Sequence, residues 1–287
     1  MKAGEYVICL DNFYTGKIKN IRNWENHPNF RLIEHDVTIP INLDIDRIWH
    51  LACPGSPLHY QRNPIKTSKT SFLGTCNMLD LAKRSKAKIL LASTSEVYGD
   101  PEIHPQKENY NGSVNPIGIR SCYDEGKRMS ESLCFDYLRK YSVDISIARI
   151  FNTYGPRMEP NDGRVISNFI CQGLRRKPLT IYGDGSQIRS FCYIDDLICG
   201  LVILMDSNFP GPINLGNSTE YSILEISNLI LDKIGLNKDT INMPLPDDDP
   251  RRRNPDISLA KEKLKWEPKI DISLGLAKTI SYFKKII

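Results

Sequence analysis

The chain has 287 residues, enough for one large domain or two unequal ones around a real hydrophobic core. Its composition is that of an ordinary globular protein, and its formal charge of +4 is too small and too dispersed to indicate nucleic-acid binding, although it suits an anionic small substrate. No apolar run approaches the roughly 18 residues that a membrane span needs, and the first residues lack the layout of a signal peptide, so we expect no membrane association.

Eight cysteines and five histidines are spread along the chain. The cysteines form no CxxC pair and are too sparse for a disulfide scaffold, so we expect reduced thiols in a cytoplasmic protein. The histidines form no HExxH or HxxxH pair, and we therefore expect no metal site.

Short apolar runs alternate with longer amphipathic stretches in the first half of the chain. The strand-like runs are residues 6–10, 47–52, 88–92 and 144–150, and the helical stretches are 64–85 and 121–141. This alternation predicts an α/β fold with a doubly wound parallel sheet and helices on both faces. Ligands of such sheets bind outside the carboxyl ends of the strands, so strand-end residues are the first candidates for a site.

The pattern changes after Gly155. Helices are predicted at 164–176, 222–234 and 273–285, and strands at 179–182 and 212–215, with Pro- and Asp-rich loops between them, notably 244–255. We predict a nucleotide-binding domain over residues 1–157 and a smaller α/β substrate domain formed mainly by 158–287. Residues around 190–206 are expected to return to the first domain.

The motif Tyr123-Asp-Glu-Gly-Lys127 opens the predicted helix 121–141. A tyrosine and a lysine four residues apart lie on one helical face. A phenol has a pKa near 10, and a nearby ammonium favours the phenolate, so Tyr123 could act as a general base near neutral pH. The motif alone is weak, because the same spacing also describes a surface pair.

The predicted strand 88–92 runs into Ser93-Thr94-Ser95-Glu96. These side chains stand at the carboxyl end of a strand, where a hydroxyl could hydrogen-bond the substrate oxygen that Tyr123 deprotonates. A strand followed by a simple hydroxyl-capped turn would look similar. The two motifs together match a hydride-transfer triad of Thr94, Tyr123 and Lys127.

At this point the chain resembles the extended short-chain dehydrogenase/reductases that act on nucleotide sugars, and within them the UDP-glucuronate decarboxylases. The resemblance covers nearly the whole chain. The segments that carry it are LDNFYTG (10–16), HLACPGSPLHYQRNPIKT (50–67), STSEVYGDP (93–101), NPIGIRSCYDEGKR (115–128), ARIFNTYGPRM (148–158), NDGRVISNF (161–169), YGDGSQIRSF (182–191) and RRNPDIS (252–258).

The resemblance implies a Rossmann-like domain with NAD as cofactor. Asp11 would bind the adenosine ribose hydroxyls, and its charge would repel a 2′-phosphate, which favours NAD over NADP. A plain strand-to-turn exit is the alternative for Asp11-Asn12. The other residues implied to contact the cofactor are Asn12, Tyr14, Thr15, Gly16, Asp36, Val37, Leu51, Ala52, Cys53, Thr70, Ser93, Tyr123 and Lys127.

The resemblance also implies a set of nucleotide-sugar contacts: Lys69, Asn77, Asn152, Arg164, Tyr182, Arg189 and Arg253. Arginine suits this role because its planar fork binds phosphate and carboxylate in a bidentate manner. A solvated charged loop is the alternative for Arg253, and a simple turn is the alternative for Tyr182.

The predicted reaction is decarboxylation of UDP-glucuronate to UDP-xylose through a 4-keto intermediate, with NAD regenerated in each turnover. The related 4,6-dehydratases carry an Asp-Glu pair where this chain has Ser95-Glu96. An added carboxylate would repel the substrate carboxylate, whereas Ser95 can donate a hydrogen bond to it, and Glu96 is the candidate acid/base for chemistry at C5. A dehydratase or 4-epimerase is the alternative. We also expect a homodimer formed through the helices at 64–85 and 121–141.

The chain departs from the family at its beginning. The family opens with a strand, a glycine-rich turn and a helix, which have no counterpart before the segment EYVICLDN. The glycine-rich turn would place backbone N–H groups on the cofactor pyrophosphate. Two explanations stay open: Met1 is an internal methionine of a longer reading frame or the chain is a fragment, or this is a genuinely shortened protein that binds NAD poorly or not at all. In the second case the chain could be a non-catalytic paralogue that binds nucleotide sugar or pairs with a full-length partner.

Overall fold

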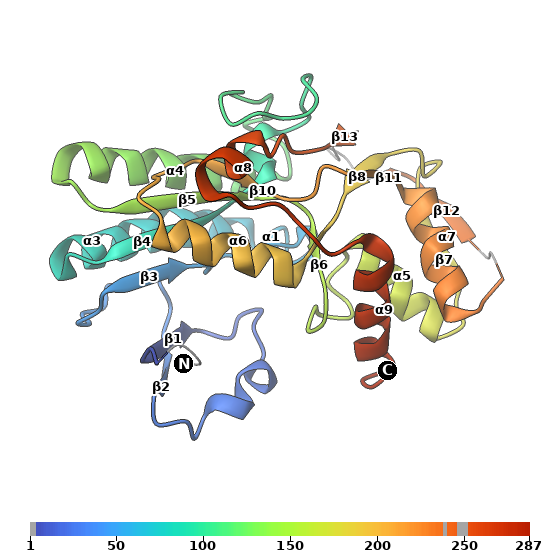
Figure 1. The fold of residues 1–287 in the computed structure, drawn as a ribbon, viewed down its shortest axis with the longest axis horizontal. Helices are drawn as coiled ribbons and strands as arrows, with labels where there is room; N and C mark the ends of the chain where they lie inside the picture. Colours follow the sequence, from blue (N-terminus) through green and yellow to red (C-terminus); the bar gives the residue numbers. More distant parts are fainter. Residues whose placement is uncertain (1–3, 238–239, 246–251) are drawn as a thin grey trace.

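The computed structural model describes residues 4–237, 240–245 and 252–287; half of the Pro- and Asp-rich loop, residues 246–251, lies outside the described residues (Figure 1). A four-stranded sheet lies in the larger part of the molecule. All its neighbouring strands are parallel, which confirms the predicted α/β class. Its strand order is β10 (Ile213–Leu215), β5 (Ile145–Ile150), β4 (Lys88–Thr94) and β3 (Arg47–His50).

Helices cover both faces of this sheet, as the sequence predicts (Figure 1). Side chains alternate between the faces of a strand, and β4 uses this alternation fully. Ile89 and Leu91 are buried against the helices α3 and α4, whereas Leu90 is buried against α6 on the other face. These three helices span Thr75–Ser85, Ser121–Tyr141 and Ile194–Asp206.

The first two strands form a separate parallel pair below the main sheet in the view of Figure 1. In this pair β1 (Val7–Asp11) lies beside β2 (Phe30–Glu34), with Asp11 opposite Glu34. The sequence analysis missed β2, because FRLIE mixes charged and apolar residues over only five positions. Within the described residues, no strand pairs with the second edge of β1 or with the outer edge of β3, so the parallel sheet is divided into two pieces.

The helix predicted over 64–85 is a composite. It begins as α2 (Pro64–Lys69), with the Asn63 side chain accepting a hydrogen bond from the backbone N–H of Lys66, and passes through a π turn, η3 (Thr70–Gly74), into α3. The π turn brings Gly74 against Val37, where a Cβ would lie 2.8 Å from a Val37 methyl. A short helix, α1 (Pro57–Tyr60), precedes this composite helix. A single helical turn, η4 (Ser95–Tyr98), follows β4.

The smaller part of the molecule packs three helices around its own core (Figure 1). Phe169, Leu179, Ile226 and Phe283 are fully buried there. The helices are α5 (Val165–Leu174), α7 (Ile223–Ile234) and α9 (Ile272–Phe283), and the strands are β7 (Leu179–Tyr182), β8 (Ile188–Ser190), β11 (Glu220–Ser222), β12 (Thr240–Met243) and β13 (Arg252–Arg253).

The remaining elements are short: η1 (Ile18–Asn20), η2 (Arg22–Trp24), β6 (Thr153–Tyr154), β9 (Cys192–Tyr193) and α8 (Ser258–Leu264). None of the helices in the described part of the chain has the length and apolarity that crossing a membrane requires. The smaller part and the sheet meet near β13, which pairs with β8 and leads Arg253 toward the carboxyl end of β4.

Candidate active site

The N-terminal turns of α4 lie against the carboxyl end of β4. Lys127 is buried and donates a 2.8 Å hydrogen bond from Nζ to the carbonyl oxygen of Ala92. Tyr123, one turn earlier, is hydrogen-bonded to the side chain of Thr94. The structure therefore brings together the three residues of the predicted hydride-transfer triad.

The Tyr123 phenol is more deeply buried than its motif suggests. Burial raises its pKa above the usual value near 10, the hydrogen bond from Thr94 opposes this, and the charge of Arg164 opposes it further. Lys127 Nζ lies 6.0 Å from the centroid of the Tyr123 ring, but desolvation of the phenol outweighs the charges that favour the phenolate. Here Tyr123 is a neutral phenol at pH 7.

Tyr60 is a neighbour of Tyr123 that the sequence analysis did not single out. The two rings stack with their centroids 4.9 Å apart and their planes 3° apart. Gly55, in the loop between β3 and α1, approaches the same phenol, since a Cβ there would lie 3.8 Å from Tyr123 Oη. No local sequence signal indicates this contact between Tyr60 and Tyr123.

Glu96 stands just beyond Thr94 and is held by two arginines. Arg253 places both Nη atoms 2.7 Å from the two carboxylate oxygens, and Arg120 donates a further hydrogen bond of 2.8 Å. Burial alone would raise the pKa of Glu96, but the two guanidinium groups lower it to about 2. Glu96 is therefore an anion, and Arg253, which we predicted to contact the substrate, contacts Glu96 here.

Asp124 follows Tyr123 and is the second buried carboxyl group of the site. It is 6% exposed, and its Oδ1 has no hydrogen-bond partner among the described residues. Burial and the negative charge of Glu96 raise its pKa to about 8, although Arg120 and Arg253 act in the opposite direction. The position inside the YDEGK motif was visible in the sequence, but its burial was not.

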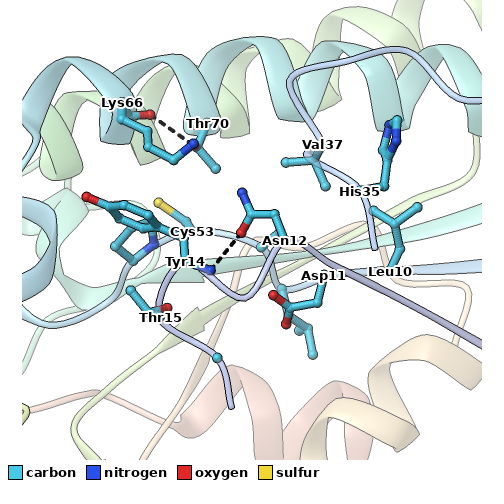
Figure 2. Close-up of a pocket in the computed structure, with 14 residues that line it drawn as sticks. Leu10, Asp11, Asn12, Tyr14, Thr15, His35, Val37, Cys53, Lys66 and Thr70 are labelled. Carbon is cyan, nitrogen blue, oxygen red and sulfur yellow. Dashed lines mark hydrogen bonds between the residues drawn. The ribbon is translucent and has the colours of Figure 1, made fainter. Parts of the chain in front are cut away.

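A pocket opens at the carboxyl ends of β1 and β3 (Figure 2). Within it, Asp11 accepts a hydrogen bond of 2.8 Å from the backbone N–H of Phe13, and Asn12 accepts one of 3.0 Å from that of Tyr14. The structure brings together most of the predicted cofactor residues, because the pocket is lined by Asp11, Asn12, Tyr14, Thr15, Gly16, Val37, Leu51, Ala52, Cys53 and Thr70. Lys66, His35, Leu10 and Pro54 also line it and were not predicted.

Gly16 lies directly against Asp11. A Cβ at this position would be 3.0 Å from Asp11 Oδ2, so only a residue without a side chain lets the loop close over the carboxylate. The loop at Gly16 and the carboxylate of Asp11 together form a cradle for a hydroxyl-bearing group. This fits the ribose of an adenine dinucleotide.

Asp36 lies behind this pocket. Its carboxylate accepts hydrogen bonds from Lys66 Nζ, Asn12 Nδ2, and the N–H and hydroxyl of Thr38. Burial is the largest single effect and raises the pKa of Asp36, but these donors together outweigh it and hold the pKa well below the usual range. Because its oxygens are already occupied, Asp36 fixes Asn12 and Lys66 in the pocket wall.

The predicted nucleotide-sugar residues are more dispersed. Asn77 donates 2.8 Å to the carbonyl of Val37, on the pocket side of α3. Arg164 is exposed and pairs with Asp162 at 2.7 Å, close enough to Tyr123 to affect its pKa. Of the other predicted nucleotide-sugar residues, Lys69 and Tyr182 are exposed, Asn152 is half-buried, and Arg189 is buried on β8. Among the predicted catalytic and cofactor residues, Ser95 is buried beside Glu96, and Ser93 points toward α4.

The comparisons with known proteins agree with this geometry. The family model described as GDP-mannose 4,6 dehydratase matches residues 4–279. UDP-glucuronic acid decarboxylase 1 of Xenopus tropicalis is 54% identical over 99% of this chain and 68% of its own length. UDP-glucuronic acid decarboxylase 3 of Arabidopsis thaliana is 56% identical over 94% of this chain and 79% of its own length.

Solved structures give the same result. A UDP-glucuronic acid 4-epimerase mutant from Bacillus cereus, in complex with UDP-4-deoxy-4-fluoro-glucuronic acid and NAD, has a TM-score of 0.88 and 30% identity, covering 99% of this chain and 93% of that one. UDP-glucose 4-epimerase from Thermotoga maritima with UDP-glucose has a TM-score of 0.90 and 26% identity over the same shares of the two chains. The chain belongs to the epimerase/dehydratase family, and within it to the UDP-glucuronic acid decarboxylases.

Proposed function

We propose that this protein is an NAD-dependent enzyme that decarboxylates UDP-glucuronate to UDP-xylose. The observation that carries the proposal is the placement of Tyr123, Thr94 and Lys127 at one strand end, in a chain 54–56% identical to UDP-glucuronic acid decarboxylases. The geometry of the three side chains supports deprotonation of a sugar hydroxyl next to a hydride acceptor.

Side chains of the protein would accept and return the protons that the reaction moves. Tyr123, after losing its own proton, would accept that of the sugar 4-hydroxyl while Thr94 hydrogen-bonds the same oxygen, and Lys127 would supply positive charge beside the phenolate. The resulting 4-ketone is β to the C6 carboxylate, so the C5–C6 bond can break with its electrons entering the carbonyl. Carbon dioxide leaves, C5 takes up a proton, and the 4-hydroxyl is restored with the proton held by Tyr123.

The carboxylate of the substrate needs a site that tolerates its charge. Ser95 is buried at the start of η4 and offers a hydroxyl, and Arg253 and Arg120 place positive charge next to it. We propose that these groups receive the C6 carboxylate and that Glu96 is the acid/base residue for C5, which requires this anion to take up a proton before C5 does. The other nucleotide-sugar contacts that we propose are Lys69, Asn77, Asn152, Arg164, Tyr182 and Arg189.

NAD fits the pocket at the ends of β1 and β3. The cradle formed by Asp11 and Gly16 would hold the adenosine ribose, and Asn12, Tyr14, Thr15 and Val37 would line the adenosine. Leu51, Ala52, Cys53, Thr70, Ser93 and Asp36 complete the proposed set. When bound, NAD accepts the hydride from C4 and returns it at the end of the turnover.

We further propose that the protein works as a cytoplasmic homodimer, joined through the helices at 64–85 and 121–141. The outer faces of these helices expose apolar side chains, among them Ile65, Phe72 and Met129. Residues 1–157 would form the NAD-binding domain, joined by 190–206, and 158–287 mainly the substrate domain. This division is supported by the packing of α6 against β4 and β5.

The test is to incubate the protein with UDP-glucuronate and NAD and to follow carbon dioxide and UDP-xylose. We expect both products in equal amounts, with no net NADH. The matched control is the Tyr123→Phe variant, which lacks the proton acceptor. Formation of a C4 epimer without carbon dioxide would establish a 4-epimerase, and binding of UDP-glucuronate without any turnover would overturn the enzymatic proposal.

A further inference from the structure

The helix α4 presents three polar side chains to the end of β4 at successive turns. Tyr123 meets Thr94, Lys127 meets the carbonyl of Ala92, and Glu131 meets Ser93. Residues four apart lie on one helical face, so the proposed base and its lysine share a continuous face with Glu131. The proposed mechanism gives Glu131 no role.

Glu131 is 8% exposed and binds two strands at once. Its Oε1 accepts a 2.5 Å hydrogen bond from Ser93 Oγ, and its Oε2 accepts one of 2.7 Å from Arg149 Nη2, with Arg149 Nε adding bonds to both oxygens. Ser93 on β4 and Arg149 on β5 are partners in register. One carboxylate therefore ties neighbouring strands to the catalytic helix, a single residue before Thr94.

The same arginine continues the network away from the helix. Arg149 Nη1 donates 3.0 Å to Tyr98 Oη, which donates 2.8 Å to Asn214 Oδ1 on β10. Asn214 donates to the carbonyl of Gln106, whose side chain accepts from the backbone N–H of Asn254 at 2.8 Å. The network thus ends next to Arg253, on the other side of Glu96.

We propose that Glu131 and Arg149 are a charge-balanced pair of positioning residues for the reaction, in which Glu131 fixes the strand end that presents Thr94 to Tyr123 and Arg149 cancels its charge. This inference rests on the proposed function for its activity readout. Neither residue touches substrate or cofactor in this role.

Glu131 and Arg149 carry opposite charges, so each charge, when left uncompensated, acts on the Tyr123 phenol in the opposite direction to the other. Eight helical residues separate Glu131 from Tyr123, or roughly 12 Å, and at an effective dielectric constant of about 20 one uncompensated charge at that distance shifts a titration by roughly one pH unit. The other charged or titratable groups that face the pair or the phenol are Lys127, Cys134, Tyr98, Glu108, Tyr60, Cys53, Glu96 and Arg164. They are common to all the variants below.

The experiment compares Glu131→Gln, Arg149→Met and the double variant. Glu131→Gln leaves the arginine uncompensated and should shift the acidic limb of the kcat profile to lower pH by about 0.5 to 1 unit. Arg149→Met leaves the carboxylate uncompensated and should shift it upward by a similar amount. The double variant should return the limb to its original position. Asp136→Asn and Arg139→Met, which break an exposed ion pair on the same helix, should shift nothing.

A second variant tests positioning without changing charge. Ser93→Ala removes the bond to Glu131, so we expect kcat at saturating NAD to fall about tenfold, since misplacement of reacting groups is costly, with the KM for UDP-glucuronate unchanged and no shift of the limb. Shifts in the same direction for both single variants, or an unshifted limb in both, would overturn the inference.

A readout that needs no turnover separates this inference from the proposed function. The phenolate of Tyr123 is titrated by ultraviolet difference spectroscopy, using Tyr123→Phe in each background as the blank. Opposite shifts of this titration in Glu131→Gln and Arg149→Met support the inference even if UDP-glucuronate is not turned over. Equal titrations in the two variants contradict it even if the enzyme is active.

Discussion

Glu96 and Arg253 are 157 positions apart and form a bidentate ion pair, with both carboxylate oxygens 2.7 Å from a guanidinium nitrogen. The pair joins the end of β4 to β13, so it connects the strand that carries Thr94 to a strand of the smaller part of the molecule. Both side chains are largely buried, which makes the pair costly to break from one side.

Removing Arg253 should therefore destabilise the fold in a pH-dependent way. The pKa of Glu96 is lowered to about 2, so its ion pairs contribute stability above the unfolded value near 4.5 and lose it as the pH falls toward 2. We expect Arg253→Met to lose about 3 kcal/mol in urea unfolding at pH 7, with the difference from wild type shrinking below pH 4.5.

Arg252→Met is the matched control for this prediction. Arg252 neighbours Arg253 but forms an exposed pair with Glu220, and such pairs contribute about 1 kcal/mol or less. Equal losses for the two arginine variants, or a loss for Arg253→Met that does not change with pH, would contradict the prediction.

Tyr123→Phe should remove activity while leaving the fold intact. The ring and its stack on Tyr60 are retained, but the proton acceptor is lost, and general acid–base catalysis contributes about 10²- to 10⁴-fold. We expect kcat for UDP-xylose formation to fall by that factor, with an unchanged thermal midpoint. Tyr141→Phe, at the exposed end of the same helix, should keep full activity.

The elements with strong local signals could be predicted from the sequence. The bounds of α4 agree with the prediction at both ends, because an amphipathic run of 21 residues is closed by Ser142 in the left-handed conformation. The strand β2 has no such signal, and the π turn inside 64–85 depends on the packing of Gly74 against Val37. Local pattern therefore predicted α4 and the four strands of the main sheet, but not β2 or the irregularities that shape the cofactor pocket.

The site could be predicted only in part for a related reason. Motifs located Thr94, Tyr123 and Lys127, since their spacing within a segment carries the chemistry. The pairing of Glu96 with Arg253 depends on how β13 comes to lie beside the carboxyl end of β4, which no local pattern encodes. Burial of Asp124 is likewise a tertiary effect, because an acidic residue in the first turn of a helix is usually exposed.

Asp124→Asn should stabilise the protein at neutral and alkaline pH. The pKa of Asp124 is raised to about 8 from an unfolded value near 3.8, so its contribution is most favourable below pH 3.8 and is lost as the pH rises through 8. An amide mimics the protonated acid and does not titrate. We expect the variant to be about 1 to 3 kcal/mol more stable than wild type at pH 9 and equal to it below pH 3.8.

Glu125→Gln is the control for Asp124→Asn. Its carboxylate is the next one along α4 but is 41% exposed, so it should change the stability by less than about 0.5 kcal/mol at either pH. If Asp124→Asn destabilises the protein at pH 9, the Asp124 carboxylate makes favourable contacts as an anion, which contradicts the prediction.

Asp11→Asn should weaken NAD binding and reduce the discrimination against NADP. A hydrogen bond to a charged group contributes about 1.5–3 kcal/mol, so we expect the Kd for NAD to rise roughly 10- to 100-fold, while the Kd for NADP falls because the charge that repels a 2′-phosphate is gone. Isothermal titration with each cofactor measures both. Glu34→Gln changes the carboxylate opposite Asp11 on β2, outside the pocket, and should alter neither value. An unchanged NAD affinity in Asp11→Asn would show that the ribose lies elsewhere and that the cradle of Asp11 and Gly16 has another purpose.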